Sequence, residues 1–119
     1  MERRVVVEID LKALVRNYRK IAAHVKPAKV LCVLKANAYG LGVGAYAKAL
    51  AKAGCTMFGV AEPYEALELQ KALKSCVSGL KSSAKDVRRK TKDAKFEVQM
   101  LSSVLPDEIP AMVRAGVIL

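Results

Sequence analysis

Residues 30–35 read Val30-Leu31-Cys32-Val33-Leu34-Lys35, an unbroken apolar run that ends in a single charge. A run of this length without alternation is typical of a strand buried on both faces, as in a parallel sheet covered by helices. The following residues, Ala36–Gly44, are rich in glycine, and an alanine-rich helical pattern runs from about Ala45 to Ala53, with Gly54 as its C-cap. The sequence therefore predicts a strand, a loop and a helix in succession.

Before this unit, apolar residues recur at helical spacing from Leu11 to Val25, with Asp10 as the predicted N-cap and Pro27 beyond the helix end. After it, Met57–Ala61 is a second apolar run of strand length. Pro63 suits the first turn of a helix that continues to about Leu73. The strand and helix pattern thus repeats.

The C-terminal part carries the same pattern once more. Phe96–Leu101 is predicted as a strand, Pro106 as the start of a helix that Gly116 stops, and Val117–Leu119 as the beginning of another strand. Alternating strands and helices favour an α/β fold with a parallel sheet, because parallel strands require crossover connections. Periodicity alone does not distinguish an open doubly wound sheet from a closed barrel. A barrel takes about 250 residues, so a chain of 119 residues would be less than half of one.

Most of the excess positive charge lies in one segment. The chain has a net charge of +10, and the segment Lys71–Lys95 holds nine of the 21 Lys and Arg residues but two of the 11 Asp and Glu residues. It contains no aromatic residue on which a base could stack, so we do not expect nucleic acid as a partner. We interpret about 75–95 as a basic insertion or linker within a single domain, 1–119. The alternative is a non-catalytic module that binds polyanions through residues 71–95.

Cysteine usage and hydropathy exclude several classes of protein. Cys32, Cys55 and Cys76 form no C-x-x-C pair, and His24 is the sole histidine, so neither a disulfide framework nor a metal site is predicted. Cys32, inside the apolar run, is expected to be a small buried residue. No stretch has the length of a membrane span and the N-terminus lacks the features of a signal peptide, so we expect a cytoplasmic protein without a membrane partner.

Lys35 is the main candidate for chemistry. At the end of an apolar strand its ammonium group would lose hydration, which lowers the pKa of an amine and makes it nucleophilic. Such a lysine can form a Schiff base with an aldehyde cofactor. The alternative is that Lys35 lies just past the strand and extends into solvent.

The longer string Val33-Leu34-Lys35-Ala36-Asn37-Ala38-Tyr39-Gly40-Leu41-Gly42 resembles the cofactor-lysine signature of alanine racemases. Residues 7–17 resemble the opening of that family, and residues 58–69 resemble its second strand and helix. The resemblance weakens in the basic segment and returns in residues 98–119. One departure is Leu41, since a histidine is common there in the family.

The resemblance implies a partial TIM (β/α)8 barrel holding the first three or so βα units of the N-terminal domain. It implies an enzyme that interconverts L-alanine and D-alanine, which supplies D-alanine for cell-wall peptidoglycan. Lys35 would bind pyridoxal phosphate as a Schiff base and act as the base on the D-alanine face, while Tyr39 would hydrogen-bond the cofactor phosphate. The family is expected to be homodimeric, with a second base from the partner's C-terminal domain, so the chain is expected to be inactive alone.

Overall fold

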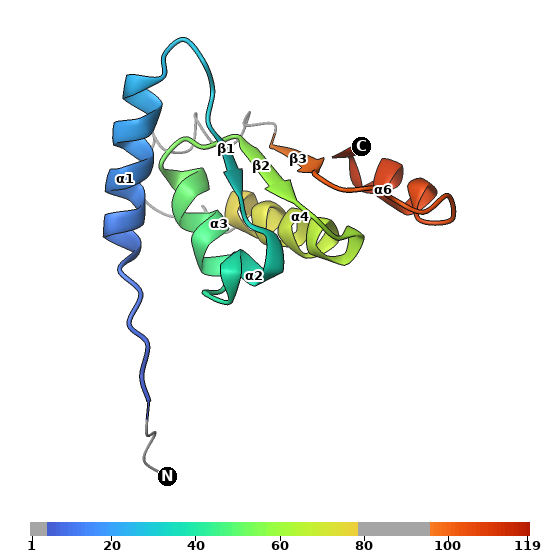
Figure 1. The fold of residues 1–119 in the computed structure, drawn as a ribbon, viewed down its shortest axis with the longest axis horizontal. Coiled ribbons are helices and arrows are strands. Elements are labelled where there is room, and N and C mark those ends of the chain that lie inside the picture. Colours follow the sequence, from blue (N-terminus) through green and yellow to red (C-terminus); the bar gives the residue numbers. More distant parts are fainter. Residues whose placement is uncertain (1–4, 79–95) are drawn as a thin grey trace.

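The computed structural model describes residues 5–78 and 96–119. Its four strands form one sheet in the order β1-β2-β3-β4, and every neighbouring pair is parallel (Figure 1). The elements are α1 (Leu11–His24), β1 (Leu31–Val33), α2 (Lys35–Tyr39), α3 (Val43–Lys52), β2 (Met57–Val60), α4 (Pro63–Ser78), β3 (Glu97–Met100), α6 (Ile109–Ala115) and β4 (Val117–Ile118). The predicted parallel α/β fold is therefore confirmed, and each of the four strands lies within a stretch that the sequence predicts as a strand.

The core lies between one face of the sheet and the helices. Strand register aligns Cys32 with Phe58, Phe58 with Val98, and Val98 with Val117 across the four strands. Phe58 and Val98 are fully buried, and this row packs under helices that contact one another in the order α1, α3, α4, α6. Because successive side chains of a strand point to opposite faces, the alternate positions form the other face of the sheet. Helices on one face of a parallel sheet with sequential strand order are what a segment of a (β/α)8 barrel requires.

The first strand differs from the prediction. All three residues of β1 are only partly buried, so the expected burial on both faces is wrong. The reason is its position, since β1 is the edge strand of the sheet among the described residues. Cys32, expected to be buried, is likewise only partly covered.

The first helix begins where the sequence predicts. The Asp10 carboxylate accepts the backbone N–H groups of Lys12 at 2.8 Å and Ala13 at 3.1 Å, which makes it the N-cap of α1. These bonds supply partners for two of the backbone donors that a helix start leaves free.

Two helix boundaries differ from those predicted. Helix α4 continues to Ser78, past the expected start of the insertion, because Leu69, Leu73 and Cys76 recur at helical spacing and are all buried. The remainder of the predicted insertion, 79–95, lies outside the described residues. Helix α6 begins at Ile109 rather than Pro106, since residues 106–108 form a turn, and it ends at Gly116 with a φ of 74° as predicted.

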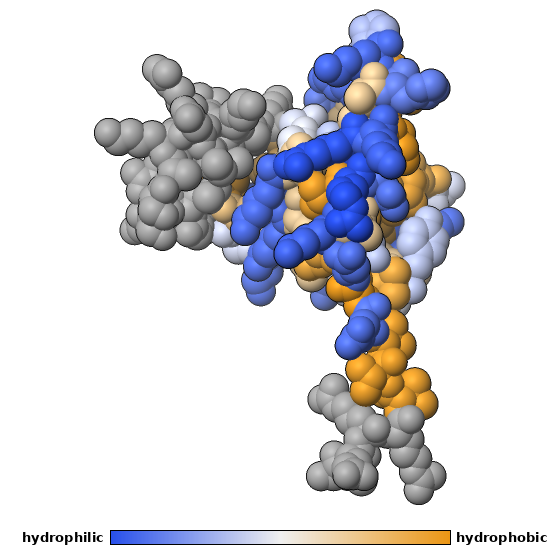
Figure 2. All heavy atoms as spheres, turned by 90° about the vertical axis from the view of Figure 1, so that its left-hand side faces the viewer, coloured by the Kyte–Doolittle hydropathy of each residue, from blue (hydrophilic) through white to orange (hydrophobic). Residues whose placement is uncertain are grey.

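The N-terminal segment projects from the folded part of the chain. Residues 5–9 are extended, and the Val5 side chain is 80% exposed (Figure 1). Figure 2, which looks onto α1, shows this apolar tail below a largely hydrophilic helix surface. None of the helices within residues 5–78 and 96–119 is both long and apolar enough to span a membrane.

Candidate active site at the end of β1

Lys35 is the first residue beyond the β1 and β2 pairing. The backbone N–H of Leu34 donates to the carbonyl of Gly59 at 2.8 Å, which extends the ladder by one residue, and the Leu34 side chain is 4% exposed. The Lys35 side chain is exposed. The expected loss of hydration at its amine is therefore wrong, and the alternative of an amine in solvent holds. Leu34 occupies the last buried position, and the chain turns directly after it.

The turn that carries Lys35 has an unusual backbone. Ala36, Asn37 and Ala38 have φ values of 51°, 54° and 53° with ψ values of 49°, 47° and 49°, and Tyr39 has a φ of 56°. Thus α2 is a left-handed turn built from four successive residues that are not glycine. This conformation costs about 1–2 kcal/mol per residue, because Cβ approaches the following carbonyl oxygen. Strain of this kind persists only where the surroundings hold it, and it gathers at functional sites.

Local hydrogen bonds hold part of this turn. The Asn37 side-chain oxygen accepts the backbone N–H of Val43 at 2.9 Å, and the Asn37 carbonyl accepts the N–H of Gly42 at 3.0 Å. The methyl group of Ala38 is 1% exposed and belongs to the core. The turn is therefore tied to the start of α3 and to the protein interior.

A buried carboxylate holds the turn from α4. Glu65 is 6% exposed, and among the described residues it is the one charged side chain that is buried. Its Oε1 accepts the N–H of Ala36 at 2.5 Å, and its Oε2 accepts the N–H groups of Ala61 and Glu62, each at 3.1 Å. Glu65 therefore caps α4 and at the same time restrains the peptide next to Lys35.

Glu65 was not singled out as a site residue in the sequence. A signal was present, because a glutamate two residues after a helix-opening proline stands where a capping-box carboxylate reaches back to the helix start. That pattern predicts the bond to Glu62. It gives no indication of the bond to Ala36, which lies 29 residues away along the chain.

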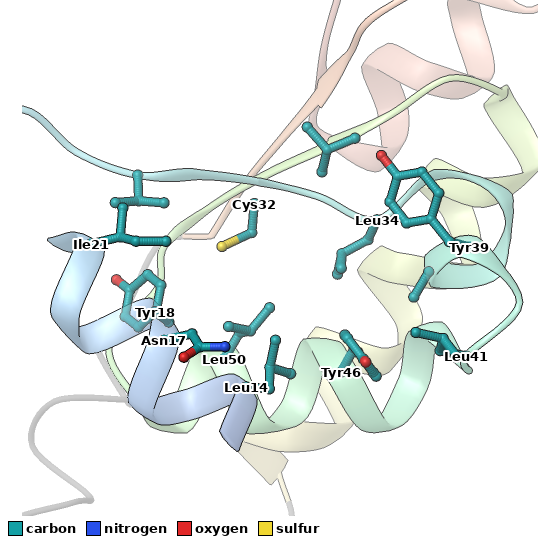
Figure 3. A pocket seen from close by; sticks show the side chains of 13 residues that line it. Leu14, Asn17, Tyr18, Ile21, Cys32, Leu34, Tyr39, Leu41, Tyr46 and Leu50 are labelled. Carbon is teal, nitrogen blue, oxygen red and sulfur yellow. The ribbon is translucent and has the colours of Figure 1, made fainter. Parts of the chain in front are cut away.

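Tyr39 is also exposed, at 61%, and it borders a cavity of about 270 Å³ between α1, β1 and α3. Figure 3 shows Tyr39 and Leu41 at one end of this cavity and Tyr18 and Ile21 at the other. Lys35 does not line the cavity, and no hydrogen bond joins its side chain to that of Tyr39 in the described part of the chain. Lys35 and Tyr39, the two predicted site residues, therefore both lie on α2, but no hydrogen bond links their side chains there.

The family model "Alanine racemase, N-terminal domain" matches residues 9–119. The chain belongs to the alanine racemase family. The parallel sheet with helices on one face is thus part of the barrel of that N-terminal domain, as the motif around Lys35 indicated.

Curated members of the family resemble the first part of the chain. "Alanine racemase 3" of Salmonella typhi is 48% identical over 68 residues, which cover 57% of this chain and 18% of the relative. The catabolic alanine racemase of Rhizobium johnstonii is 48% identical over 65 residues, covering 55% of this chain and 17% of the relative. The matched residues therefore cover less than a fifth of the length of these alanine racemases.

Solved structures of the family match most of the chain. Alanine racemase from Bartonella henselae, described as having covalently bound pyridoxal phosphate, has a TM-score of 0.68 and 33% identity. The match covers 92% of this chain and 26% of the Bartonella henselae chain. Alanine racemase from E. faecalis has a TM-score of 0.69 and 27% identity, with 92% of this chain and 24% of its own matched. The partial barrel therefore has the fold of the alanine racemases.

Proposed function

We propose that this chain supplies the cofactor-binding part of an alanine racemase active site, with Lys35 as the point of attachment for pyridoxal phosphate. The observation that carries the proposal is the position of Lys35. Its amine is exposed at the carboxyl edge of a parallel sheet, on a strained turn held by Glu65. Barrels of this class keep their active sites at that edge.

The residues present fit this cofactor. An aldehyde reacts with a primary amine that it can reach, and the exposed Lys35 amine meets that requirement. The exposed Tyr39 hydroxyl is a suitable donor for a phosphate oxygen, and a side-chain carbon added at Gly40 or Gly42 would meet nothing within 4 Å, so there is open space beside the turn. The covalently bound pyridoxal phosphate of the Bartonella henselae neighbour supports the same assignment.

When bound, pyridoxal phosphate withdraws electrons from the α-carbon of an amino acid and so makes its proton acidic. Lys35 then serves as the base, taking or returning the α-proton of alanine at its Nζ atom on the D-alanine face. Tyr39 holds the phosphate end. The product of this proposed reaction is D-alanine for peptidoglycan, made in the cytoplasm.

Racemisation also requires a base on the opposite face of the substrate. In this proposal that group comes from outside the described residues, within a homodimer such as the family is expected to form. We therefore expect the purified 119-residue chain to bind the cofactor without converting L-alanine to D-alanine. A measurable turnover by the purified chain would contradict this part of the proposal.

The alternative, a polyanion-binding module, is less well supported. The family match runs through the basic segment from residue 9 to residue 119, so that segment does not stand apart as a separate module. Residues 79–95 lie outside the described residues, so no structural observation supports this alternative. We therefore keep the enzymatic interpretation.

The test is to incubate the chain with pyridoxal phosphate, reduce it with borohydride, and locate the modified lysine by peptide mapping. We expect label on Lys35 and its loss in Lys35→Arg, which keeps the charge but not the primary amine. Lys29→Arg is the matched control, because Lys29 is an exposed lysine at the opposite end of β1. Equal labelling of Lys29 and Lys35 would show that pyridoxal phosphate reacts with exposed lysines nonspecifically, and it would contradict the assignment of Lys35 as the cofactor site.

A further inference from the structure

Two of the three cysteines face each other across β1 and β2. The Sγ atoms of Cys32, on β1, and Cys55, just before β2, lie 3.4 Å apart. The Cys55 thiol is also 3.3 Å from the carbonyl oxygen of Met57. Cys76, on α4, is buried elsewhere in the core. The sequence predicted no pairing, because residues 32 and 55 are distant in the chain and show no motif.

One of these sulfurs is reached from solvent through the cavity of about 270 Å³. Cys32 lines that cavity, and Figure 3 shows its sulfur between Tyr18 and Leu50 and pointing into the open space. Cys55, by contrast, is 1% exposed and lies behind Cys32. A small solute therefore meets Cys32 first, with the second sulfur directly behind it.

We propose that Cys32 and Cys55 form an oxidisable dithiol site that takes hydrogen peroxide and closes to a disulfide. The Cys32 thiol passes its proton to the Cys55 thiolate 3.4 Å away as the Cys32 sulfur attacks one peroxide oxygen. The O–O bond breaks, the departing oxygen takes that proton, and the products are a sulfenic acid on Cys32 and water. Cys55 sulfur then attacks the Cys32 sulfur, the S–O bond breaks, the S–S bond forms, and a second water leaves. Two thiols and one peroxide thus become one disulfide and two waters, with two electrons passing from sulfur to oxygen.

The environment of Cys55 favours the second step. Its pKa lies below the ordinary value of 9.0, chiefly because its side-chain hydrogen bond with Cys32 favours the thiolate form of Cys55. The same interaction, followed by burial, raises the pKa of Cys32. Cys55 is therefore the readier thiolate and the natural attacking group once Cys32 is oxidised. Moving two sulfurs from 3.4 Å to a bond of about 2.05 Å requires only a small local shift.

The two thiols do not depend on the proposed attachment of pyridoxal phosphate to Lys35, because neither lies on α2, although Tyr39 of α2 borders the cavity that leads to Cys32. Oxidation would nevertheless tie β1, three residues before Lys35, to the loop before β2. The consequence is a covalent restraint across the first two strands. It would raise the temperature of unfolding by several degrees, since the link closes a loop of 23 residues.

The experiment treats the folded chain with a small excess of hydrogen peroxide, blocks the remaining thiols, and maps disulfides without reduction. We expect a link between the Cys32 and Cys55 peptides in the wild type and in Cys76→Ser, and no link in Cys32→Ser or Cys55→Ser. The same treatment in denaturant should scatter the links among all three cysteines. If the wild type in its folded state gives a sulfinic acid on Cys32, a link to Cys76, or no modification, the dithiol site is refuted.

Wild-type mapping alone decides the matter should any cysteine variant fail to fold. Circular dichroism before and after oxidation identifies such failures. An unchanged unfolding temperature after formation of the Cys32–Cys55 link would refute the proposed restraint on β1 and β2. Cofactor labelling of Lys35, measured separately, has no bearing on either outcome.

Discussion

The Glu65 carboxylate lies 2.5 Å from the backbone nitrogen of Ala36, so a residue on α4 directly restrains the peptide bond next to Lys35. Its two oxygens have separate tasks, since Oε1 holds α2 and Oε2 caps the start of α4. Glu65 is buried and these hydrogen bonds are partly buried, so water replaces the carboxylate less well than it would at the surface. Removing the carboxylate would leave several donors unsatisfied, at a cost of about 1–3 kcal/mol each.

Glu65→Gln separates the two tasks. A glutamine has one acceptor oxygen, which can still cap α4, while its NH₂ group then faces the Ala36 N–H and repels it. We expect a loss of about 1–2 kcal/mol in unfolding free energy and faster amide hydrogen exchange in residues 35–42. Glu65→Ala should cost more and speed exchange at residues 61–66 as well.

The matched control is Glu68→Gln, on the exposed side of the same helix. It removes the same charge, and its effect should stay within about 0.5 kcal/mol. Rapid exchange confined to α4 in Glu65→Gln, with α2 unchanged, would contradict the assigned role of Oε1. This readout requires no cofactor and is therefore independent of the function proposed for Lys35.

The fold was largely predictable from the sequence, because its first two strands lie in apolar runs and glycine, proline or Asp10 marks the ends of its helices. Met57–Val60 and Glu97–Met100 lie within the predicted strands, and Asp10 caps α1 as expected. These elements depend on local pattern and burial. The last turn of α4 was missed because Cys76 lies among polar and charged residues, which obscured the helical spacing.

The site was less predictable, for physical reasons that involve particular residues. Lys35 ends an apolar run, but whether its amine is covered depends on residues distant in sequence, and those described leave it exposed. Ala36 and Ala38 have no preference for positive φ, so the left-handed turn has no local signal. The residue that stabilises this turn, Glu65, lies on another element and contacts it across 29 positions.

Glycine substitutions should reveal the strain in α2. Ala36 is exposed with a φ of 51°, so Ala36→Gly relieves backbone strain of about 1–2 kcal/mol, which offsets the entropy cost of glycine of about 0.5–1 kcal/mol. We expect an unfolding free energy equal to or above that of the wild type. Ala45→Gly, at an exposed position of the right-handed helix α3, should instead lose about 0.5–1 kcal/mol. Equal losses at both positions in denaturant unfolding would contradict the left-handed conformation.

Acid should weaken the start of α1 through Asp10. Hydrogen bonds from the Ala13 and Lys12 N–H groups, together with the Arg16 charge, lower the pKa of Asp10 below its ordinary value of 3.8. A lowered pKa in the folded state means that the stabilisation is complete above the ordinary value and is lost as pH falls through the lowered one. Asp10→Asn keeps a capping oxygen without a titratable group. The unfolding temperature of the wild type should therefore fall toward that of Asp10→Asn, or below it, in strong acid, and a constant difference across pH would contradict this.

Gly59 leaves room for the side chain of Leu101 on the face of the sheet opposite Phe58. A Cβ atom at residue 59 would lie 2.9 Å from the Leu101 Cδ1 atom, too close for an unmoved neighbour. Leu101 is 48% exposed and its side chain can rotate away, so Gly59→Ala should cost only about 1 kcal/mol. The double variant Gly59→Ala, Leu101→Ala should recover most of that loss, as measured by a double-mutant cycle in denaturant.

A glycine-to-alanine substitution where the added Cβ has open space around it is expected to stabilise the chain, in contrast to Gly59→Ala. Gly44 lies in α3, where an added Cβ meets nothing within 4 Å, so Gly44→Ala should stabilise the chain by about 0.5–1 kcal/mol through helix propensity. Gly59 also accepts the N–H of Leu34, and any backbone shift forced there reaches the residue before Lys35. Gly59→Ala should therefore reduce borohydride-trapped pyridoxal phosphate on Lys35, whereas Gly44→Ala should not. If the losses of unfolding free energy from Gly59→Ala and Leu101→Ala simply add in the double variant, the Leu101 side chain is not the group that the added Cβ displaces.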